Sequence, residues 1–420
     1  MRTAIGWKAW RDSSLKCALL ASALAGTAFL VACGGGSGSA PAPPIATAGG
    51  APPGTSPSPT PVPTASSAPT STTYSVPAGI QHITFSSDGK LWYTADSTLT
   101  GDASTVGFLN PATGSVTSFN ALTASESPYL MENELAAGAN GSVWYILNWL
   151  GAGCPSPGGG QPCTQAPSMV NQVTEAGAVT AYSAGTVTNA NLNDLALGAD
   201  GNVYVGAWYG QSPNVYGAVL KIVPGQTGGP AAIDAVPQST SADPTTLAPG
   251  PNGTLGVVEE FGGPSTPSTV DSFAAGSFTQ IGSVADPGVF GIAFTSSTST
   301  YWLWQAYFTI TNSSGPGTGY WTSQIDRMTT GGATSSYPMP SSGEVTTSLH
   351  GQGNDQIAVA PNGSIYYSEG NAEKIARFNP STGVTTEYPI ASDVIGLAID
   401  GTGNIWVASR NGQITKVSSF

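Results

Sequence analysis

One set of side chains in this sequence has the composition of an acid–base site. His350, Asp355 and Glu369 lie close together along the chain, and His350 is one of only two histidines. A histidine beside carboxylates can titrate near neutral pH and act as a general base. The same residues also fit a loop and a strand end that share no geometry. The sequence leaves both interpretations open.

Carboxylates also raise the question of a metal ion. Glu369 is one candidate ligand and Glu259, beside Glu260, is another. Oxygen ligands of this kind suit Mg²⁺ or Ca²⁺, although a solvated acidic pair is the alternative for Glu259. The chain contains no Walker loop, no nucleophile elbow and no zinc-type spacing. The sequence therefore requires no cofactor, and Mg²⁺ or Ca²⁺ is the ion that these residues would accept.

The elements that position these residues follow a repeat. Residues 357–390 predict four antiparallel strands, with an Asn-Gly turn before an aromatic strand. Related copies begin at other Gly turns and at one Ser/Thr turn, which precedes Tyr301-Trp302-Leu303-Trp304. The turn glycines are Gly89, Gly141, Gly201, Gly253, Gly363 and Gly403. Seven such units predict an all-β fold, a seven-bladed β-propeller of four-stranded antiparallel blades.

The two ends of the repeat region predict how the ring closes. The last unit stops after its third strand, at residues 413–417, and residues 73–77 have the pattern of a fourth strand. We expect this N-terminal strand to complete the last blade, which would protect the sheet edges. The propeller domain is thus expected over residues 73–420.

The segment before the propeller predicts where in the cell the protein is located. Residues 1–32 combine a basic start with an apolar stretch that is short for a membrane span, and they end in Leu-Val-Ala before Cys33. This resembles the bacterial lipoprotein signal, which implies acylation of Cys33 and anchoring in the cell envelope; Gly34 favours the outer membrane. Residues 33–72 are rich in Gly, Pro, Ser and Thr and predict a disordered tether.

The remaining cysteines and the charge narrow the class of protein further. Cys154 and Cys163 flank a Pro/Gly-rich loop, and an exported protein would close it with a disulfide. This insertion, residues 149–166, is long for a propeller loop and is expected to form a rim at one mouth. The net charge of −13 argues against nucleic-acid binding.

In a propeller, the starts of the inner strands meet at one mouth of the central channel. These starts carry oxygen-bearing or amide side chains that could bind a small polar ligand or a cation. They are Gln81, Asn133, Asn193, Thr245 and Asp355. The alternative is that they form hydrogen bonds from blade to blade.

Aromatic residues are dense in the fifth unit. Tyr301, Trp302 and Trp304 are followed by Tyr307 and Phe308, and residues 320–321 are Tyr-Trp. They could form an exposed platform for a glycan or a protein partner. The other interpretation is that they fill the core of a blade that has lost its turn motif.

One stretch resembles a known family. PNGSIYYSEGNAEKIARFNPSTGVTTEYPI is similar to the repeat of the streptogramin B lyases (virginiamycin B lyase). The resemblance implies a seven-bladed propeller, a C–O elimination by a histidine base, and acidic residues at second-strand ends that help to hold Mg²⁺. It is close only over residues 357–417.

The family's base position carries no histidine in this chain. It falls on Asp355 in the sixth unit, and in the others on Gln81, Asn133, Asn193, Thr245, Phe290 and Ile395. His82 is one residue away from this position, and neighbours in a strand face opposite sides. The acidic position is kept at Glu369 and Glu259. It is lost at Ala95, Leu147, Ala207 and Ser409.

These observations favour a non-catalytic, lipid-anchored monomer of the cell envelope that binds a small ligand, a glycan or an envelope protein. The alternative is an enzyme, either a streptogramin-lyase-like C–O lyase or a lactonase-type hydrolase with a metal in the channel.

Overall fold

The computed structural model describes the strands of the repeat region and many of their turns. The described residues are 69–95, 105–121, 129–149, 168–183, 191–211, 214–225, 232–235, 242–261, 267–284, 289–310, 319–339, 344–345, 356–369, 373–390 and 394–418. The signal and tether segments, Cys33, Cys154, Cys163, His350 and Asp355 lie outside this set, so the predictions for them stay predictions. Among the described residues, no helix is long and apolar enough to cross a membrane.

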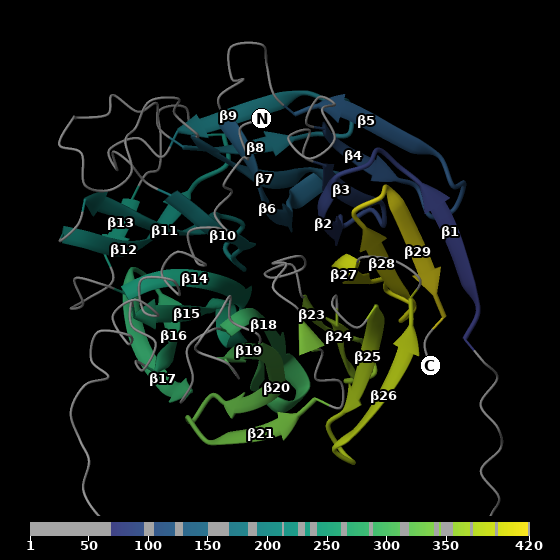
Figure 1. The fold of residues 1–420 in the computed structure, drawn as a ribbon. Helices are drawn as coiled ribbons and strands as arrows, with labels where there is room; N and C mark the ends of the chain where they lie inside the picture. Colours follow the sequence, from purple (N-terminus) through teal and green to yellow (C-terminus); the bar gives the residue numbers. More distant parts are fainter. Residues whose placement is uncertain are drawn as a thin grey trace, which may run out of the picture.

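Seven antiparallel sheets surround a central axis, and six of them are built from strands consecutive in sequence (Figure 1). Blade one contains β2 (Ile80–Phe85), β3 (Leu91–Ala95), β4 (Thr105–Leu109) and β5 (Val116–Asn120). Blade two contains β6 (Tyr129–Ala137), β7 (Val143–Trp149), β8 (Met169–Val173) and β9 (Val179–Ser183). Blade three contains β10 (Asn191–Leu197), β11 (Val203–Gln211), β12 (Asn214–Ile222) and β13 (Ala232–Ala235).

The other blades follow the same order. Blade four contains β14 (Ala242–Pro249), β15 (Leu255–Phe261), β16 (Ser268–Ala274) and β17 (Ser277–Val284). Blade five contains β18 (Val289–Thr295), β19 (Thr300–Ile310), β20 (Gly319–Thr329) and β21 (Thr334–Pro338), and β22 (Glu344–Val345) also pairs with β20. Blade six contains β23 (Ile357–Val359), β24 (Ile365–Glu369), β25 (Lys374–Asn379) and β26 (Val384–Pro389).

Blade seven confirms the predicted closure of the ring. It contains β27 (Val394–Ile399), β28 (Ile405–Ser409) and β29 (Gln413–Val417), and its outer strand is β1 (Ser71–Ser75). Tyr74 pairs with Ile414, and the Thr70 amide donates to Ser418 Oγ at 2.8 Å. The sequence therefore predicted both the number of blades and the strand that joins the first blade to the last.

The hydrophobic core is divided into seven clusters, one between each pair of neighbouring blades. The second strand of most blades contributes a large aromatic ring, as Trp92 does between blades one and two. Trp92, Trp144, Trp302 and Trp406 are each at most 2% exposed. These rings pack between blades, and their burial stabilises the contact between sheets whose strands do not pair with one another.

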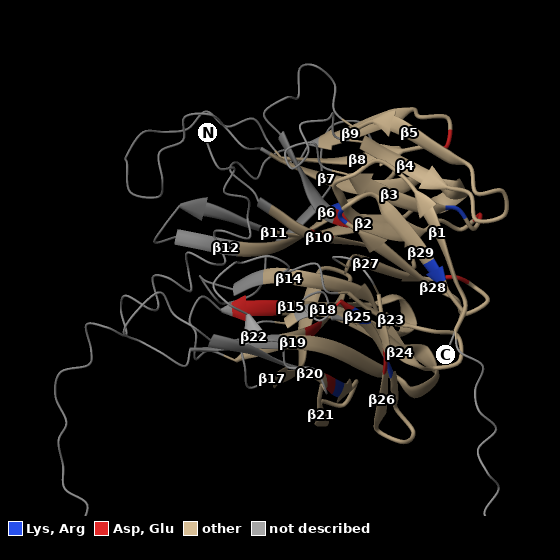
Figure 2. Cartoon of the chain, turned by 45° about the vertical axis from the view of Figure 1, so that its right-hand side comes forward, with Lys and Arg blue, Asp and Glu red and all other residues tan. Residues whose placement is uncertain are grey.

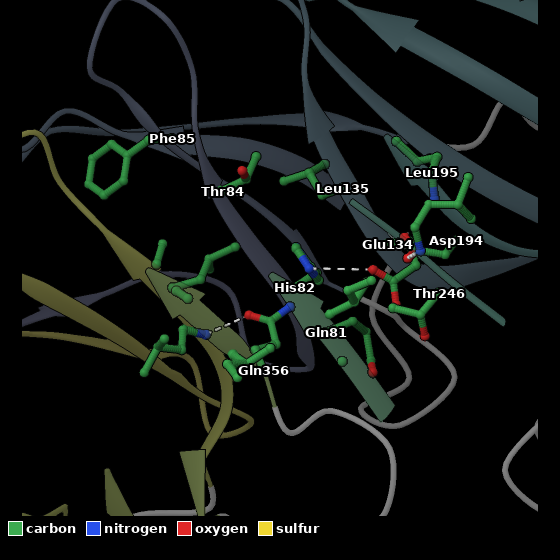
Figure 3. Close-up of a pocket in the computed structure, with 18 of the residues that line it drawn as sticks. Gln81, His82, Thr84, Phe85, Glu134, Leu135, Asp194, Leu195, Thr246 and Gln356 are labelled. Atoms are coloured by element: carbon green, nitrogen blue, oxygen red, sulfur yellow. Dashed lines mark hydrogen bonds and ion pairs between the residues drawn. The ribbon is translucent and has the colours of Figure 1, made fainter. Parts of the chain in front are cut away.

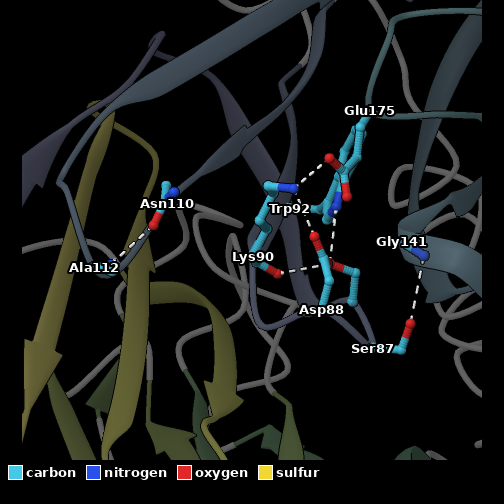
Figure 4. Close-up of polar contacts among 9 residues, drawn as sticks. Ser87, Asp88, Lys90, Trp92, Asn110, Ala112, Gly141 and Glu175 are labelled. Atoms are coloured by element: carbon cyan, nitrogen blue, oxygen red, sulfur yellow. Dashed lines mark hydrogen bonds and ion pairs between the residues drawn. The ribbon is translucent and has the colours of Figure 1, made fainter.

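Turns at the periphery add polar contacts between blades. Lys90, after the β2–β3 turn, pairs with Asp88 at 2.6 Å and also with Glu175 of the β8–β9 turn in blade two (Figure 4). The Gly141 amide donates to Ser87 Oγ at 3.4 Å across the same boundary. Such partly exposed pairs contribute little individually. Charged residues are sparse in the described part of the ring, and most of its surface is uncharged (Figure 2).

Candidate functional site

The inner strands of all seven blades enclose a cavity at the centre of the ring. Its volume is about 430 Å³, which is within the size range of small-molecule sites. In each of blades one to six, a polar or glycine residue lines it at an equivalent position of the inner strand, followed by aliphatic residues. These six residues, here called the channel ring, are His82, Glu134, Asp194, Thr246, Gly291 and Gln356. The equivalent residue of blade seven is Gly396, which precedes Leu397 of the cavity wall.

A β-bulge near the start of the inner strands positions the channel ring. The pairing register shifts between Ile80 and His82 in blade one, and between Leu192 and Asp194 in blade three. The same shift occurs before Thr246, Gly291 and Gly396. A bulge inserts one unpaired residue, which re-aims the side chains on either side of it.

The bulge explains why sequence reasoning selected the neighbouring positions. Gln81, Asn193 and Thr245 are the bulged residues themselves, and only Gln81 belongs to the cavity wall. The Asn193 amide nitrogen instead donates to the Pro244 carbonyl of blade four at 2.9 Å. Thr245 is 5% exposed, and its hydroxyl has no hydrogen-bond partner among the described residues. The side chain of Asn133 lies outside the described set.

The predicted acid–base trio is not assembled by the described residues. His350 and Asp355 lie outside them, and Glu369 is described only in its backbone, which pairs with Lys374 at the end of β24. Their proposed catalytic role, and the metal-binding role of Glu369, stay predictions. The histidine that does lie in the cavity is His82, which sequence reasoning set aside because strict alternation would turn it away from the channel.

His82 and Glu134 form the most polar contact of the cavity. His82 Nε2 lies 3.5 Å from Glu134 Oε2, and the two side chains are 14% and 28% exposed (Figure 3). Burial lowers the pKa of His82 to about 3. The imidazole is therefore neutral at physiological pH. Its Nδ1 has no hydrogen-bond partner among the described residues.

Two other members of the channel ring connect neighbouring blades. Asp194 accepts hydrogen bonds from the Leu195 amide and from the Leu247 amide of blade four, each at 2.6 Å. Gln356 Oε1 accepts a hydrogen bond from the Leu397 amide of blade seven, also at 2.6 Å. The bonds from Leu247 and Leu397 order the cavity wall, because each one fixes a side chain of one inner strand to the backbone of the next.

Glu259 lies away from the cavity, in blade four near the end of β15. It is 5% exposed, and Asp271 on the neighbouring strand β16 is 6% exposed. Burial and the nearby Asp271 raise the pKa of Glu259 to about 8. Among the described residues no group of three His, Cys, Asp or Glu could hold a metal ion. The metal-binding prediction for Glu259 therefore gains no further ligand from this part of the chain.

The aromatic residues of blade five divide into two sets. Tyr301, Trp302 and Trp304 are buried, at no more than 5% exposure, so they belong to the core rather than to a surface platform. Tyr307 pairs in register with Thr322, and Phe308 with Trp321, in the outer part of the β19–β20 hairpin. The side chains of this outer part lie outside the described set, so the platform remains a prediction for them alone.

Comparison with solved structures supports the fold. Virginiamycin B lyase from Staphylococcus aureus is 18% identical, with a TM-score of 0.57 over 84% of this chain and 100% of that chain. A catalytically inactive variant of that enzyme, with Quinupristin, is 16% identical with a TM-score of 0.55, over 84% and 100% of the two chains. Hydrazine synthase from Kuenenia stuttgartiensis is 14% identical with a TM-score of 0.59, over 81% and 96%.

No protein-family model and no curated protein matches the sequence. The solved structures compared above are far below the identity at which function can be transferred, and one propeller fold serves many unrelated activities. They show that this chain has the seven-bladed fold of the streptogramin B lyases, as its repeat suggested. The chemistry of the cavity must be argued from its own residues.

Proposed function

We propose that this protein is a lipid-anchored β-propeller of the cell envelope that binds a small polar ligand in its central cavity without transforming it. The observation that carries the proposal is the channel ring, in which hydrogen-bonding side chains of blades one, two, three, four and six converge on one cavity. Convergent polar groups in an otherwise apolar cavity are the usual mark of a specific binding site.

The charge of the cavity indicates what the ligand offers. The part of the wall formed by described residues contains the carboxylates of Glu134 and Asp194 and no Lys or Arg. His82 is neutral, since burial holds its pKa at about 3. A ligand with an ammonium group or with several hydrogen-bond donors therefore fits better than a simple anion.

A binding role is also favoured over catalysis by the state of the histidine. A general base works best when its pKa lies near the working pH, and the pKa of His82 is far below it. In blade one, the residue at the position matching the family's base is Gln81, whose amide cannot accept a proton in this pH range. The histidine of the described cavity is thus suited to recognition rather than to proton abstraction at neutral pH.

A thermal-shift screen of amines, amino acids, sugars and glycans tests this function on the full-length protein. We expect some members to raise Tm and none to be consumed. Glu134→Gln should weaken binding by about tenfold, the value of a lost hydrogen bond to a charged group. Glu175→Gln, which changes an exposed carboxylate of a peripheral turn, should leave binding unchanged. The absence of any stabilising compound would refute the proposal.

An enzyme remains the second candidate because one specific contact favours it. The His82–Glu134 pair is a histidine oriented by a carboxylate inside the channel. Mg²⁺-dependent linearisation of a cyclic depsipeptide, or hydrolysis of a lactone, would support this function, and His82→Asn should abolish it. Asp355→Asn and Glu369→Gln test the predicted trio in the same assay. Intact substrates after long incubation would exclude this candidate.

The lipid anchor is tested separately from the cavity. Wild-type protein should incorporate a labelled fatty acid and fractionate with the outer membrane. Cys33→Ser should remove the label and release the protein from the membrane fraction, because a Cys33 acyl group would be the attachment. Equal membrane association of the two proteins would contradict the anchor and leave the binding function untouched.

A further inference from the structure

The side chain of Gln356 enters the cavity wall from blade six in an orientation that its neighbour dictates. A carboxamide ends in an acceptor oxygen and a donor nitrogen, and either could face a ligand. The Leu397 N–H of blade seven can only donate, and its nitrogen lies 2.6 Å from Gln356 Oε1. The oxygen is therefore held against blade seven, and the Nε2 amino group is the end that remains for the cavity.

The amino group of Gln356 keeps its hydrogen atoms for another partner. Gln356 lines the cavity and is only partly buried. Among the described residues, Leu397 is the one hydrogen-bond partner of this side chain. In Figure 3 the dashed line leaves the oxygen of Gln356, and its nitrogen lies on the side of His82. Gln356 thus offers a ligand an uncharged donor of fixed orientation.

The equivalent contact of blade three shows what distinguishes Gln356. Asp194 Oδ2 accepts the N–H of Leu247, whose position in blade four matches that of Leu397 in blade seven. Asp194 Oδ1 accepts the Leu195 N–H at 2.6 Å. The backbone therefore engages both oxygens of Asp194. In blade six the same kind of contact engages only the oxygen of the side chain, because the other end of a carboxamide is a donor.

The charged groups of the cavity lie across from Gln356. Figure 3 shows Glu134, Asp194 and Thr246 on one side of the cavity and Gln356 on the other. Glu134 is 28% exposed and lies 3.5 Å from His82, whose imidazole is neutral. A cation is therefore favoured at Glu134, and a hydrogen-bond acceptor is favoured at Gln356. An anionic acceptor would be repelled by the two carboxylates, so the acceptor that fits best is uncharged.

We propose that the cavity selects an amine that also carries an uncharged acceptor oxygen, with its ammonium group at Glu134 and that oxygen on the Nε2–H of Gln356. Amino alcohols, amino ethers and amino sugars share this chemistry. An amine without the oxygen would displace water from the Gln356 donor and leave it unpaired. Gln356 is then the residue that determines specificity. This inference rests on the proposed binding function and specifies its ligand class.

Matched small molecules test the class by isothermal titration calorimetry on the full-length protein. In 2-methoxyethylamine an ether oxygen replaces one methylene of butylamine. We expect the amino ether to bind about fivefold more tightly than butylamine, the net value of one hydrogen bond between neutral groups. β-Alanine, which carries a carboxylate, and 2-methoxyethanol, which lacks the ammonium, should both bind more weakly than the amino ether.

Two outcomes of the titrations would overturn the inference. One is an amino ether that binds no more tightly than butylamine, and the other is β-alanine binding more tightly than the amino ether. In either case, butylamine binding that is lost in Glu134→Gln would still support the proposed function. The ligand class and the binding function can therefore fail separately.

Gln356→Glu tests the residue itself, because it keeps an oxygen for the Leu397 N–H and replaces the amino group by a second acceptor. The preference for the amino ether over butylamine should disappear, while butylamine binding is kept or strengthened by the added charge. Gln413→Glu makes the same change at an exposed position of β29 and should leave the preference unchanged. A preference that survives in Gln356→Glu, or that is lost in Gln81→Glu instead, would overturn the assignment.

An NMR measurement on the wild-type protein does not depend on how a variant folds. With ¹⁵N-labelled glutamine, the side-chain NH₂ signals of Gln356 are assigned by their loss in Gln356→Glu or, if that variant has a lowered Tm, in Gln356→Met. We expect one of the two proton signals to move downfield with 2-methoxyethylamine and not with butylamine. Equal shifts with both probes, or none while the amino ether binds, would overturn the assignment of the oxygen to Gln356.

Discussion

Blades four and five differ from the rest of the ring in complementary ways. Blade four carries Gly256 where the other blades carry a Trp or Tyr, such as Trp302 in blade five. Blade five carries Tyr301 where the others have an aliphatic residue, such as Leu255 in blade four. A Cβ on Gly256 would collide with the Tyr301 ring. The aromatic ring missing from one blade is thus supplied by the next.

This exchange shows that the requirement for close packing applies to the interface between two blades and not to each blade by itself. Tyr301 is fully buried in the cluster between blades four and five, beside Ile292 and Met328. Its ring also lies 4.8 Å from that of Phe294. A repeat can lose its characteristic residue when its neighbour restores the lost volume, because close packing depends on the sum of the two faces.

The two blades also differ at the ends of their second strands. Glu259 in blade four and Gln305 in blade five occupy equivalent positions, each near a buried aspartate on the third strand. In blade five, Gln324 donates to Gln305 at 2.8 Å and to Asp326 at 3.1 Å. In blade four, Glu259 Oε1 has no hydrogen-bond partner among the described residues. In blade five, the side-chain amides form hydrogen bonds with one another and with the aspartate. In blade four, the raised pKa of Glu259 keeps its carboxyl group protonated.

The largest loss of stability should come from removing the Tyr301 ring, which fills the space beside Gly256. Tyr301→Ala is expected to destabilise the protein by about 3–5 kcal/mol, because it leaves a cavity against the glycine of blade four. Denaturant unfolding of the full-length protein measures this loss. A cost below that of a peripheral aromatic substitution such as Tyr388→Ala would mean that blade four does not depend on its neighbour.

Restoring the repeat in blade four should also be harmful. Gly256→Trp follows the pattern of the other blades, yet we expect it to cost about 1–3 kcal/mol because Tyr301 already occupies the space. The double variant Gly256→Trp with Tyr301→Leu should recover part of that loss. A double variant that is as unstable as the sum of its parts would argue against the exchange.

The buried proton of Glu259 should appear in the pH dependence of stability. Its folded pKa of about 8 lies above the ordinary value of 4.5, so the folded state holds the proton more tightly. Stability from this group is present below pH 4.5 and falls by about 1.4 kcal/mol per pH unit until pH 8. Glu259→Gln should lack this decline in urea unfolding.

The comparison of Glu259→Gln with wild type is required because His82 acts in the opposite sense. Its folded pKa of about 3 lies below the ordinary 6.5, so its contribution to stability is lost as pH falls below 6.5. Subtracting the wild-type curve from that of the variant cancels His82 and isolates Glu259. Parallel curves from pH 5 to pH 8 would contradict the raised pKa.

The smallest effect is expected in blade five. Gln305→Leu removes the acceptor for Gln324 and should cost about 1 kcal/mol, the net value of one hydrogen bond. The cost should be the same from pH 5 to pH 8, because neither glutamine of this hydrogen bond titrates. A cost that changes with pH over this range would weaken the contrast between the two blades.

Local chemistry was enough to predict most of the fold. The Asn-Gly and Asp-Gly turns place glycine where the backbone needs a positive φ, as at Gly363 with φ 82°. Blade five lacks such a turn, but Ser299 with φ 49° serves instead, and the aromatic strand after it still marked the blade. The alternating burial of an outer strand such as β5 follows from strand geometry alone.

The cavity could not be predicted to the same degree. Strict alternation selected Gln81 and set aside His82, and the bulge that brings His82 to the cavity leaves no signal in a single strand. Glu134 was missed for the same reason, since its role depends on an ion pair with the neighbouring blade. The exchange between Gly256 and Tyr301 is likewise a property of two blades together, which a search for one repeat at a time overlooks.

The pairing of β1 with β29 has a consequence for how the chain reaches its native state. A hydrogen bond beside this pair joins residues 348 positions apart, so the last sheet cannot be completed until nearly the whole chain is present. Until the ring closes, β29 has an open edge, and β1 of another copy fits it as well as the chain's own β1. Ring closure therefore competes with strand exchange between molecules, and dilution favours the closed ring.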